Sequence, residues 1–139
     1  MDQGNLRRSE AVAGEFMICL DTNYLIRALI PATPEARAIE GWLRSGELLM
    51  IPSVVWYEFL CGSTDEEEQL ALTILDGRII PFDEAEARIS AASFRVMKKP
   101  RRLRVDAMIA GTAIVACAKL ATANTEDFVP FVAHGLKLI

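Results

Sequence analysis

Three acidic residues stand where their neighbours do not account for a carboxylate. Asp21 directly follows the apolar run 16–20, and Glu58 lies in "SVVWYEFLCG", where the residues three and four positions away are apolar or small. Asp106 is the only acidic residue in the largely apolar stretch 104–120. Burying a carboxylate is unfavourable unless a positive charge meets it. Because oxygen ligands without cysteine or histidine select a hard cation, these residues are candidate ligands of Mg²⁺ or Mn²⁺.

Each of the three also has an alternative role in the fold. Asp21 could cap the helix that follows it, although Thr22 is equally suited to that position. Asp106 could cap its own helix in the same way, and Glu58 could be an ordinary surface glutamate. The other acidic side chains fit the first turns of helices, where the dipole favours negative charge, or solvent. They include Glu66, Glu67 and Glu68, then Asp83, Glu84 and Glu86, and finally Glu35, Glu40 and Glu47.

A fourth candidate position lies in "TANTEDF", residues 122–128, which follows an expected strand. Asn124 or Asp127 could orient a water molecule on the metal ion. Alternatively, Asn124 and Thr125 could form a simple turn, with Asp127 in solvent. We therefore treat Asn124 and Asp127 as candidate site residues with an open alternative.

The basic residues are unevenly distributed in a chain whose net charge is −4. Five of the seven residues in "KKPRRLR" are basic, namely Lys98, Lys99, Arg101, Arg102 and Arg104. The segment could be a solvated linker between two helices. It could also be a local patch that contacts phosphates on an otherwise acidic protein. Its position just before Asp106 would place a nucleic-acid backbone beside the candidate metal site.

Short apolar runs alternate along the chain with helical patterns, and these elements must position the candidate residues. Thr33, which precedes a proline, is a candidate N-cap. Capping boxes are expected at Thr64 with Glu67 and at Asp83 with Glu86. The expected strands are 16–20, 48–51, 78–80, 120–123 and 136–139, and the expected helices are 22–29, 34–44, 53–61, 64–75, 83–97 and 105–120.

Strands that alternate with helices pair in parallel through right-handed crossovers, with helices on both faces of the sheet. The expected fold is therefore a three-layer α/β/α sandwich with a central, mostly parallel sheet of four to five strands. Ligands of such sheets bind beyond the carboxyl ends of the strands. Asp21 ends the first strand, Glu58 lies two helical turns beyond the second, and Asp106 opens the helix that leads into the fourth. These three points can converge at one edge of the sheet.

The length of 139 residues fits a single domain. We expect that domain over residues 15–139, after a polar and flexible leader at residues 1–14. The leader lacks the apolar region of a secretory signal. No apolar run reaches the roughly 18 residues that a membrane helix needs, so no membrane association is expected.

The cysteine and histidine content narrows the possible chemistry. Cys19, Cys61 and Cys117 are widely spaced in apolar surroundings, which is typical of reduced core thiols in a cytoplasmic protein. His134 is the single histidine, so zinc hydrolase sites and histidine-based triads have little to be built from.

Four segments resemble the motifs of the PIN domain family, and more narrowly those of VapC-type toxin ribonucleases. They are "LDTNYLI", "SVVWYEFLCG", "VDAMIAGTAI" and "LATANTEDF", which occur in the family's order and roughly its spacing over residues 16–139. The resemblance implies a PIN-like, Rossmann-like three-layer α/β fold and cleavage of RNA with Mg²⁺ or Mn²⁺ in the cytoplasm. It also implies a cognate antitoxin that blocks the site, and usually a homodimer.

Matched motif by motif, the resemblance assigns the metal to Asp21, Glu58 and Asp106, with Thr22 and Asn23 supporting the first of them. A metal ion held there would activate a water molecule against the scissile phosphodiester. The RNA backbone beside it would contact the three arginines of the basic segment, Arg101, Arg102 and Arg104.

The chain departs from the family's fullest pattern at the fourth position. Where many relatives carry an acid straight after the strand and a Thr-Arg-like pair, this chain has Ala123 and Asn124. Asn124 can coordinate a metal through its amide oxygen but carries no charge. Whether one or two ions are held, and whether Asn124 or Asp127 is the fourth site residue, therefore stays open.

Two other function classes are also open. Receiver domains and aspartyl phosphotransferases place acids at strand ends, but the former require an acidic pair after the first strand. The latter require a second aspartate where Asn23 stands. A catalytically weak or inactive PIN-fold binding module is the other alternative, because Asn124 replaces a charged residue.

Overall fold

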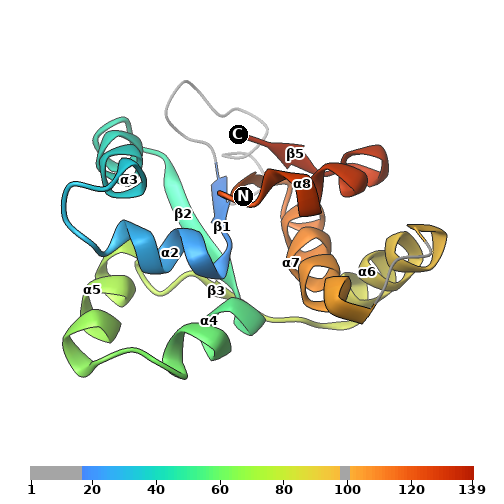
Figure 1. Ribbon diagram of the computed structural model, residues 1–139, viewed down its shortest axis with the longest axis horizontal. Helices are drawn as coiled ribbons and strands as arrows, with labels where there is room; N and C mark the ends of the chain where they lie inside the picture. Colours follow the sequence, from blue (N-terminus) through green and yellow to red (C-terminus); the bar gives the residue numbers. More distant parts are fainter. Residues whose placement is uncertain (1–16, 98–100) are drawn as a thin grey trace, which may run out of the picture.

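A five-stranded parallel sheet runs through the centre of the computed structural model (Figure 1). The structure describes residues 17–97 and 101–139, so the predicted leader and Lys98 and Lys99 lie outside the described residues. The strand order is β3-β2-β1-β4-β5, and every neighbouring pair is parallel. The strands are β1 (Met17–Leu20), β2 (Leu48–Pro52), β3 (Ile79–Ile80), β4 (Lys119–Ala121) and β5 (Lys137–Leu138).

Helices flank the sheet, which confirms the predicted three-layer α/β architecture. Figure 1 shows α2, α3 and α5 on one side of the sheet and α6 and α7 on the other. The α-helices are α2 (Thr22–Ala28), α3 (Pro34–Arg44), α4 (Ser53–Leu60), α5 (Asp65–Leu75), α6 (Glu84–Met97), α7 (Arg104–Val115) and α8 (Thr125–Phe128). Two 3₁₀ helices, η1 (Arg101–Leu103) and η2 (Val129–His134), precede α7 and follow α8.

The predicted helix starts are present where their cap residues stand. The Thr33 side chain accepts a hydrogen bond from the backbone N–H of Ala36, 3.0 Å away, at the start of α3. Thr64 and Glu67 form the complete capping box of α5. Local side-chain hydrogen bonds of this kind satisfy backbone groups that a helix end leaves unpaired. They explain why the boundaries of α3 and α5 follow directly from the sequence.

The end of α7 was predicted wrongly. The expected helix 105–120 ends at Val115, because Cys117 adopts a left-handed conformation with φ 57°. The N–H of Cys117 then donates to the carbonyl of Ile114, and the N–H of Ala118 donates to that of Ala113. This pair of bonds is the Schellman motif, which closes a helix and usually has glycine at the position of Cys117. The following strand, β4, therefore ends at Ala121 rather than at residue 123.

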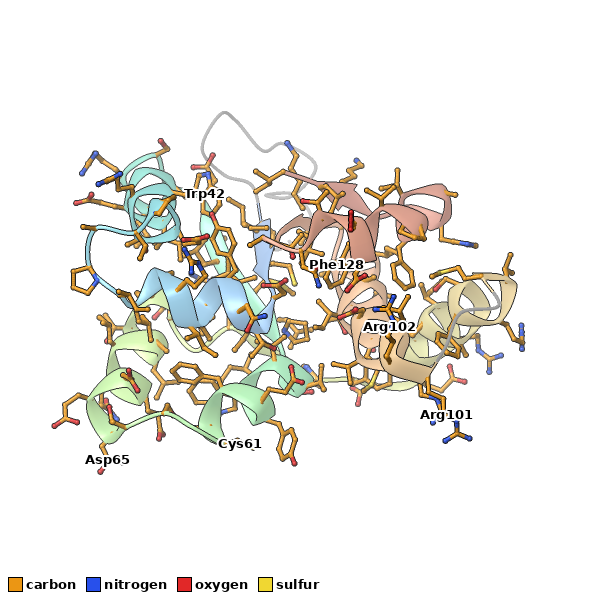
Figure 2. The ribbon with its side chains drawn as sticks, viewed as in Figure 1. Trp42, Cys61, Asp65, Arg101, Arg102 and Phe128 are labelled. Atoms are coloured by element: carbon orange, nitrogen blue, oxygen red, sulfur yellow. The ribbon has the colours of Figure 1, made fainter. Side chains whose placement is uncertain are left out.

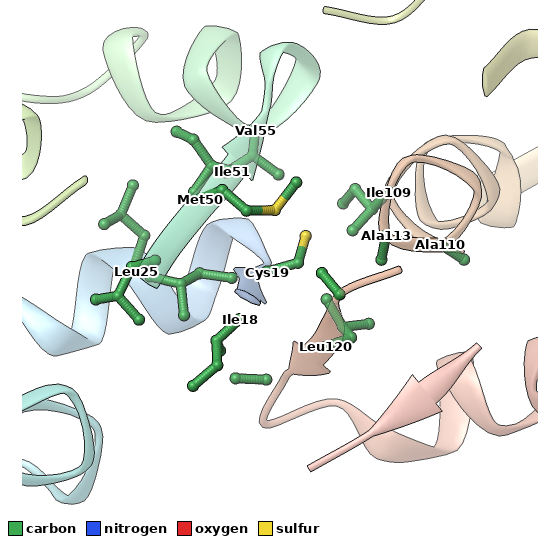
Figure 3. Close-up of a cluster of buried hydrophobic side chains, with 14 of the residues drawn as sticks. Ile18, Cys19, Leu25, Met50, Ile51, Val55, Ile109, Ala110, Ala113 and Leu120 are labelled. Carbon is green, nitrogen blue, oxygen red and sulfur yellow. The ribbon is translucent and has the colours of Figure 1, made fainter. Parts of the chain in front are cut away.

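The core lies on both faces of β1, the central strand. Ile18, Cys19 and Leu20 are each at most 2% exposed. Figure 3 shows apolar side chains from β1 and β2 packed against others from α7 and β4. Burial of Cys19 agrees with its prediction as a core thiol. Cys61 and Cys117 are exposed, so their prediction as core residues was wrong.

Helix α7 is buried along most of its length, as its apolar composition predicted. It packs so closely on α6 that a Cβ atom added to Gly111 would lie 2.0 Å from the Oγ of Ser90. A residue with a side chain would require the Ser90 hydroxyl to move, because glycine alone leaves it room in the present packing. Neither α7 nor any other helix in the described parts of the chain has the length and hydropathy to cross a membrane.

Candidate active site

The candidate residues gather where the order of the strands reverses. From β1 the chain proceeds outwards through β2 and β3, and it then returns to the opposite side of β1 as β4 and β5. The carboxyl ends of β1 and β4 therefore flank the crevice at which open α/β sheets bind ligands. The two ends are joined directly, because the N–H of Asp21 donates to the carbonyl of Ala121 at 3.3 Å. Figure 1 shows α4 and the first turn of α7 approaching this edge.

Asp21 is held from two sides. One oxygen, Oδ1, accepts the backbone N–H of Tyr24 at 2.8 Å and so caps α2, while Oδ2 accepts the hydroxyl of Thr122. The side chain is buried, with 6% of the residue exposed. Burial and the nearby charge of Glu58 raise the pKa of Asp21, although both hydrogen bonds oppose the shift. A carboxylate has about four lone-pair positions, so the capping role leaves room for a further ligand.

Glu58 reaches the same edge from α4. Its Oε1 accepts a hydrogen bond from the hydroxyl of Thr22, which joins the start of α2 to α4. The resemblance assigned Thr22 and Asn23 to the support of Asp21, but the hydroxyl of Thr22 is directed to Glu58 instead. Asn23 is exposed, and its side chain makes no hydrogen bond to any described residue. Thr22 therefore orients the second carboxylate rather than the first.

Asp106 lies in the first turn of α7 and is partly buried. The residue at the N-cap of α7 is Leu103, so Asp106 does not have the capping role that was its alternative. Burial raises the pKa of Asp106 to about 6, together with the negative charges of Asp127, Asp21 and Glu58. Four elements, α2 with its N-cap Asp21, α4, α7 and α8, thus bring four carboxylates close enough to interact electrostatically. Such mutual repulsion is relieved when a cation is bound among them.

Asp127 and Asn124 form a hydrogen-bonded pair beside Asp106. The side-chain amide of Asn124 donates to Oδ2 of Asp127 at 2.7 Å, and Oδ1 of Asp127 lies 3.5 Å from Nη1 of Arg102. Asp127 is therefore not merely solvated, because both of its oxygens have protein partners. The same arginine counteracts the rise in the pKa of Asp106.

Thr122 is the site residue that the sequence analysis missed. Its hydroxyl donates to Asp21 and also accepts the backbone N–H of Asn124 at 2.9 Å. The expected strand 120–123 contained Thr122, which would have made it an ordinary sheet residue. Because β4 ends at Ala121, Thr122 is the first residue beyond the strand. The one signal in the sequence that could have identified Thr122 is that a polar residue follows an apolar strand directly.

The donor set fits a divalent hard cation better than any other ion. It consists of carboxylate oxygens from Asp21, Glu58 and Asp106, with no sulfur or imidazole among them. Within residues 17–97 and 101–139, no three acidic, cysteine or histidine side chains are drawn together tightly enough to enclose an ion.

The arginines of the basic segment take different positions. Arg101, Arg102 and Arg104 are all exposed. Figure 2 shows Arg102, the partner of Asp127, below Phe128 in this view, whereas Arg101 points away from the body of the molecule. The segment is therefore neither a uniform linker nor a uniform patch, because only part of it faces the acidic residues.

The sequence model of the PIN domain family matches residues 18–129, which is most of the chain. No curated protein gives a significant sequence match. Several solved structures are similar in three dimensions. A toxin–antitoxin complex from Klebsiella pneumoniae is 28% identical, and the match covers 81% of this chain and 90% of that one with a TM-score of 0.65.

Two further structures show the same likeness. FitAcB from Neisseria gonorrhoeae is 26% identical, with 88% of this chain and 96% of that one covered at a TM-score of 0.61. The structure of VapBC2 from Rickettsia felis, which was solved with a DNA fragment of the VapBC2 promoter, is 20% identical to this chain. Its match covers 89% of this chain and 98% of that chain at a TM-score of 0.63, and it supports the fold alone.

Proposed function

Because this chain belongs to the PIN domain family, we propose that it is a metal-dependent endoribonuclease and the toxin of a toxin–antitoxin pair. The observation that carries the proposal is the electrostatic coupling of Asp106 to Asp21, Glu58 and Asp127 at the carboxyl edge of the sheet. A group of acids that destabilise one another is costly unless a cation offsets their charge. Binding of a catalytic metal ion would explain why these four acidic residues lie close together.

Asp21, Glu58 and Asp106 would hold one or two Mg²⁺ or Mn²⁺ ions. A divalent ion bound there supplies Lewis-acid activation of water and offsets negative charge on the departing oxygen. The protein's contribution is orientation: Thr122 fixes the carboxylate of Asp21, and Thr22 fixes that of Glu58. Hydrogen-bond partners of this kind hold metal ligands in place before the ion arrives.

The remaining site residues act on water and on the RNA chain. Asn124 and Asp127, already joined by a hydrogen bond, would hold the attacking water near the scissile phosphodiester. Arg101, Arg102 and Arg104 would contact phosphates of the RNA backbone, which positions a strand without reading its bases. No histidine or cysteine is required in this scheme.

The proposed partners follow from the toxin–antitoxin complexes among the structural neighbours. The Klebsiella pneumoniae complex and FitAcB are more than a quarter identical to this chain and are covered almost completely by it. We therefore expect a cognate antitoxin that covers the acidic edge, a homodimeric toxin, and action on RNA in the cytoplasm.

The direct test is incubation of the purified protein with total RNA, with and without Mn²⁺. Wild type should produce discrete fragments only with the ion, and Asp21→Asn and Asp106→Asn should lose this activity. Glu126→Gln, which changes an exposed acid in the neighbouring helix α8, is the matched control and should cut like wild type. Cleavage without metal, or equal cleavage by the aspartate variants, would overturn the proposal.

A further inference from the structure

Arg102 occupies a different environment from the other two arginines of its segment. Its Nη1 lies 3.5 Å from Oδ1 of Asp127, and the side chain is 66% exposed. Arg101 and Arg104 form no ion pair with any residue in the described part of the chain. In Figure 2 the side chains of Arg101 and Arg102 point in different directions, with Arg101 directed away from the body of the molecule. Arginines that are neighbours in the basic segment therefore differ in their surroundings: Arg102 pairs with an acidic residue, and Arg101 pairs with none that the structure describes.

The partner of Arg102 is itself fixed. Asn124 donates to Oδ2 of Asp127 at 2.7 Å, and the backbone N–H of Asn124 is in turn bound by Thr122 at 2.9 Å. Thr122 also donates to Asp21. A continuous series of contacts thus runs from the guanidinium of Arg102 to the first carboxylate of the site. This places the guanidinium at the border of the acidic edge rather than along a distant surface.

The ion pair of Arg102 is easily exchanged. It is long, and most of the arginine side chain is exposed, so it contributes little to stability. A guanidinium presents five donors in a planar fork, and phosphate accepts two of them side by side. A phosphate that enters the site can therefore replace Asp127 as the partner of Arg102 at little cost.

We propose that Arg102 is a catalytic residue that contacts the scissile phosphate, and that Asp127 holds its guanidinium in place until RNA binds. This inference rests on the proposed ribonuclease function. Arg101 and Arg104 would instead contact phosphates that flank the cleavage position. Charge that develops on the scissile phosphate is then met by a cation already held beside it, which is the arrangement that lowers barriers most effectively.

Steady-state cleavage of an RNA oligonucleotide of mixed sequence tests this division. With Mn²⁺ present, Arg102→Ala should lower kcat by roughly 10²- to 10³-fold, whereas Arg101→Ala should act mainly on KM and raise it a few-fold. Arg44→Ala, which changes an exposed arginine on α3, is the control and should cut like wild type. Arg102→Lys should recover part of the loss, because it keeps the charge without the fork. Added guanidinium ion should partly restore Arg102→Ala, a rescue that a purely structural role would not give.

A second readout needs no cleavage. Loss of the guanidinium beside the acidic edge removes a charge that repels a divalent ion, so calorimetric titration should show Mn²⁺ binding several-fold more tightly to Arg102→Ala than to wild type. Arg101→Ala should bind Mn²⁺ like wild type.

The outcomes separate the two proposals. If wild type cuts RNA with Mn²⁺ but Arg102→Ala and Arg101→Ala show the same kcat, only the role of Arg102 is overturned. Unchanged Mn²⁺ affinity in Arg102→Ala also overturns it. If wild type does not cut RNA at all, the proposed function fails and this inference fails with it.

Discussion

Two threonine hydroxyls define the site at the scale of single residues. Thr122 donates to Asp21 and Thr22 donates to Glu58, so each carboxylate is oriented by a residue from a different element. The acids themselves were identifiable from the sequence, because a carboxylate on an apolar face demands an explanation. Thr122 was not, because its importance depends on which residue ends β4.

Replacing Thr122 by valine tests the orienting role. The change keeps the side-chain shape but removes the donor to Asp21, so metal affinity and cleavage should each fall by roughly 10- to 100-fold. Thr73→Val, which changes an exposed threonine on α5, is the matched control and should leave both unchanged. Calorimetry with Mn²⁺ and RNA cleavage measure the two effects. Wild-type metal affinity in Thr122→Val would show that the hydroxyl does not orient the ligand.

Asp106 predicts a pH dependence of stability. Its pKa is about 6 in the folded protein against an ordinary value of 3.8, so the folded state binds the proton more tightly than the unfolded chain. The free energy of unfolding of the metal-free protein should therefore fall as the pH rises from 3.8 to about 6, with no further loss from this group above that range. Asp106→Asn removes this contribution.

Urea unfolding of wild type and Asp106→Asn, in the presence of a chelator and over a range of pH, measures this contribution of Asp106 to the free energy of unfolding. The variant should gain stability relative to wild type as the pH rises through this window. With saturating Mn²⁺ the order should reverse, because the ion favours the ionised carboxylate. Parallel pH curves for the two proteins without metal would contradict the assignment.

At the scale of elements, predictions succeeded where local hydrogen bonds decide a boundary. Thr33 and Thr64 begin α3 and α5 as expected because each satisfies a backbone N–H within its own turn. The end of α7 was missed because Cys117 adopts a left-handed conformation that normally requires glycine. No residue type in that stretch indicates the turn. A separate error, the end of β4 at Ala121 rather than at residue 123, concealed Thr122.

The contact between α6 and α7 holds the helix that carries Asp106. It can be tested by a substitution that adds one methyl group at the contact. Gly111→Ala would bring a Cβ atom to 2.0 Å from Oγ of Ser90 and to 3.1 Å from the Cβ and backbone N of Ser90, so the hydroxyl must rotate and the two helices must shift slightly apart. We expect the free energy of unfolding to fall by about 1–3 kcal/mol. Gly41→Ala in α3 is the matched control, because nothing lies within 4 Å of its added Cβ. That control should stabilise the protein by up to about 1 kcal/mol through helix propensity.

Urea denaturation of both glycine variants gives the comparison. Opposite signs would support close packing at Gly111. Equal effects would show that α6 and α7 have room to spare, and that the position of Asp106 is set by other contacts.

At the scale of the whole molecule, the topology explains why distant motifs meet. The chain leaves β1 in one direction and returns on its other side, so the ends of β1 and β4 face each other. The parallel sheet with helices on both faces was predictable from the alternation of strands and helices, but the strand order was not. The exposure of Cys61 and Cys117 was not, because an apolar neighbourhood in sequence does not fix which side of an element a residue occupies. The net charge of −4 also does not indicate that basic and acidic groups occupy separate positions around the site.

Calorimetric titration of Mn²⁺ into the metal-free protein tests the central claim most directly. Wild type should bind the ion, and Asp21→Asn, Glu58→Gln and Asp106→Asn should each lose at least about tenfold in affinity. Glu126→Gln, the exposed neighbour in α8, should bind like wild type. If wild type binds no ion, or if the three variants bind it as tightly as wild type does, carboxylates from β1, α4 and α7 do not form one metal centre.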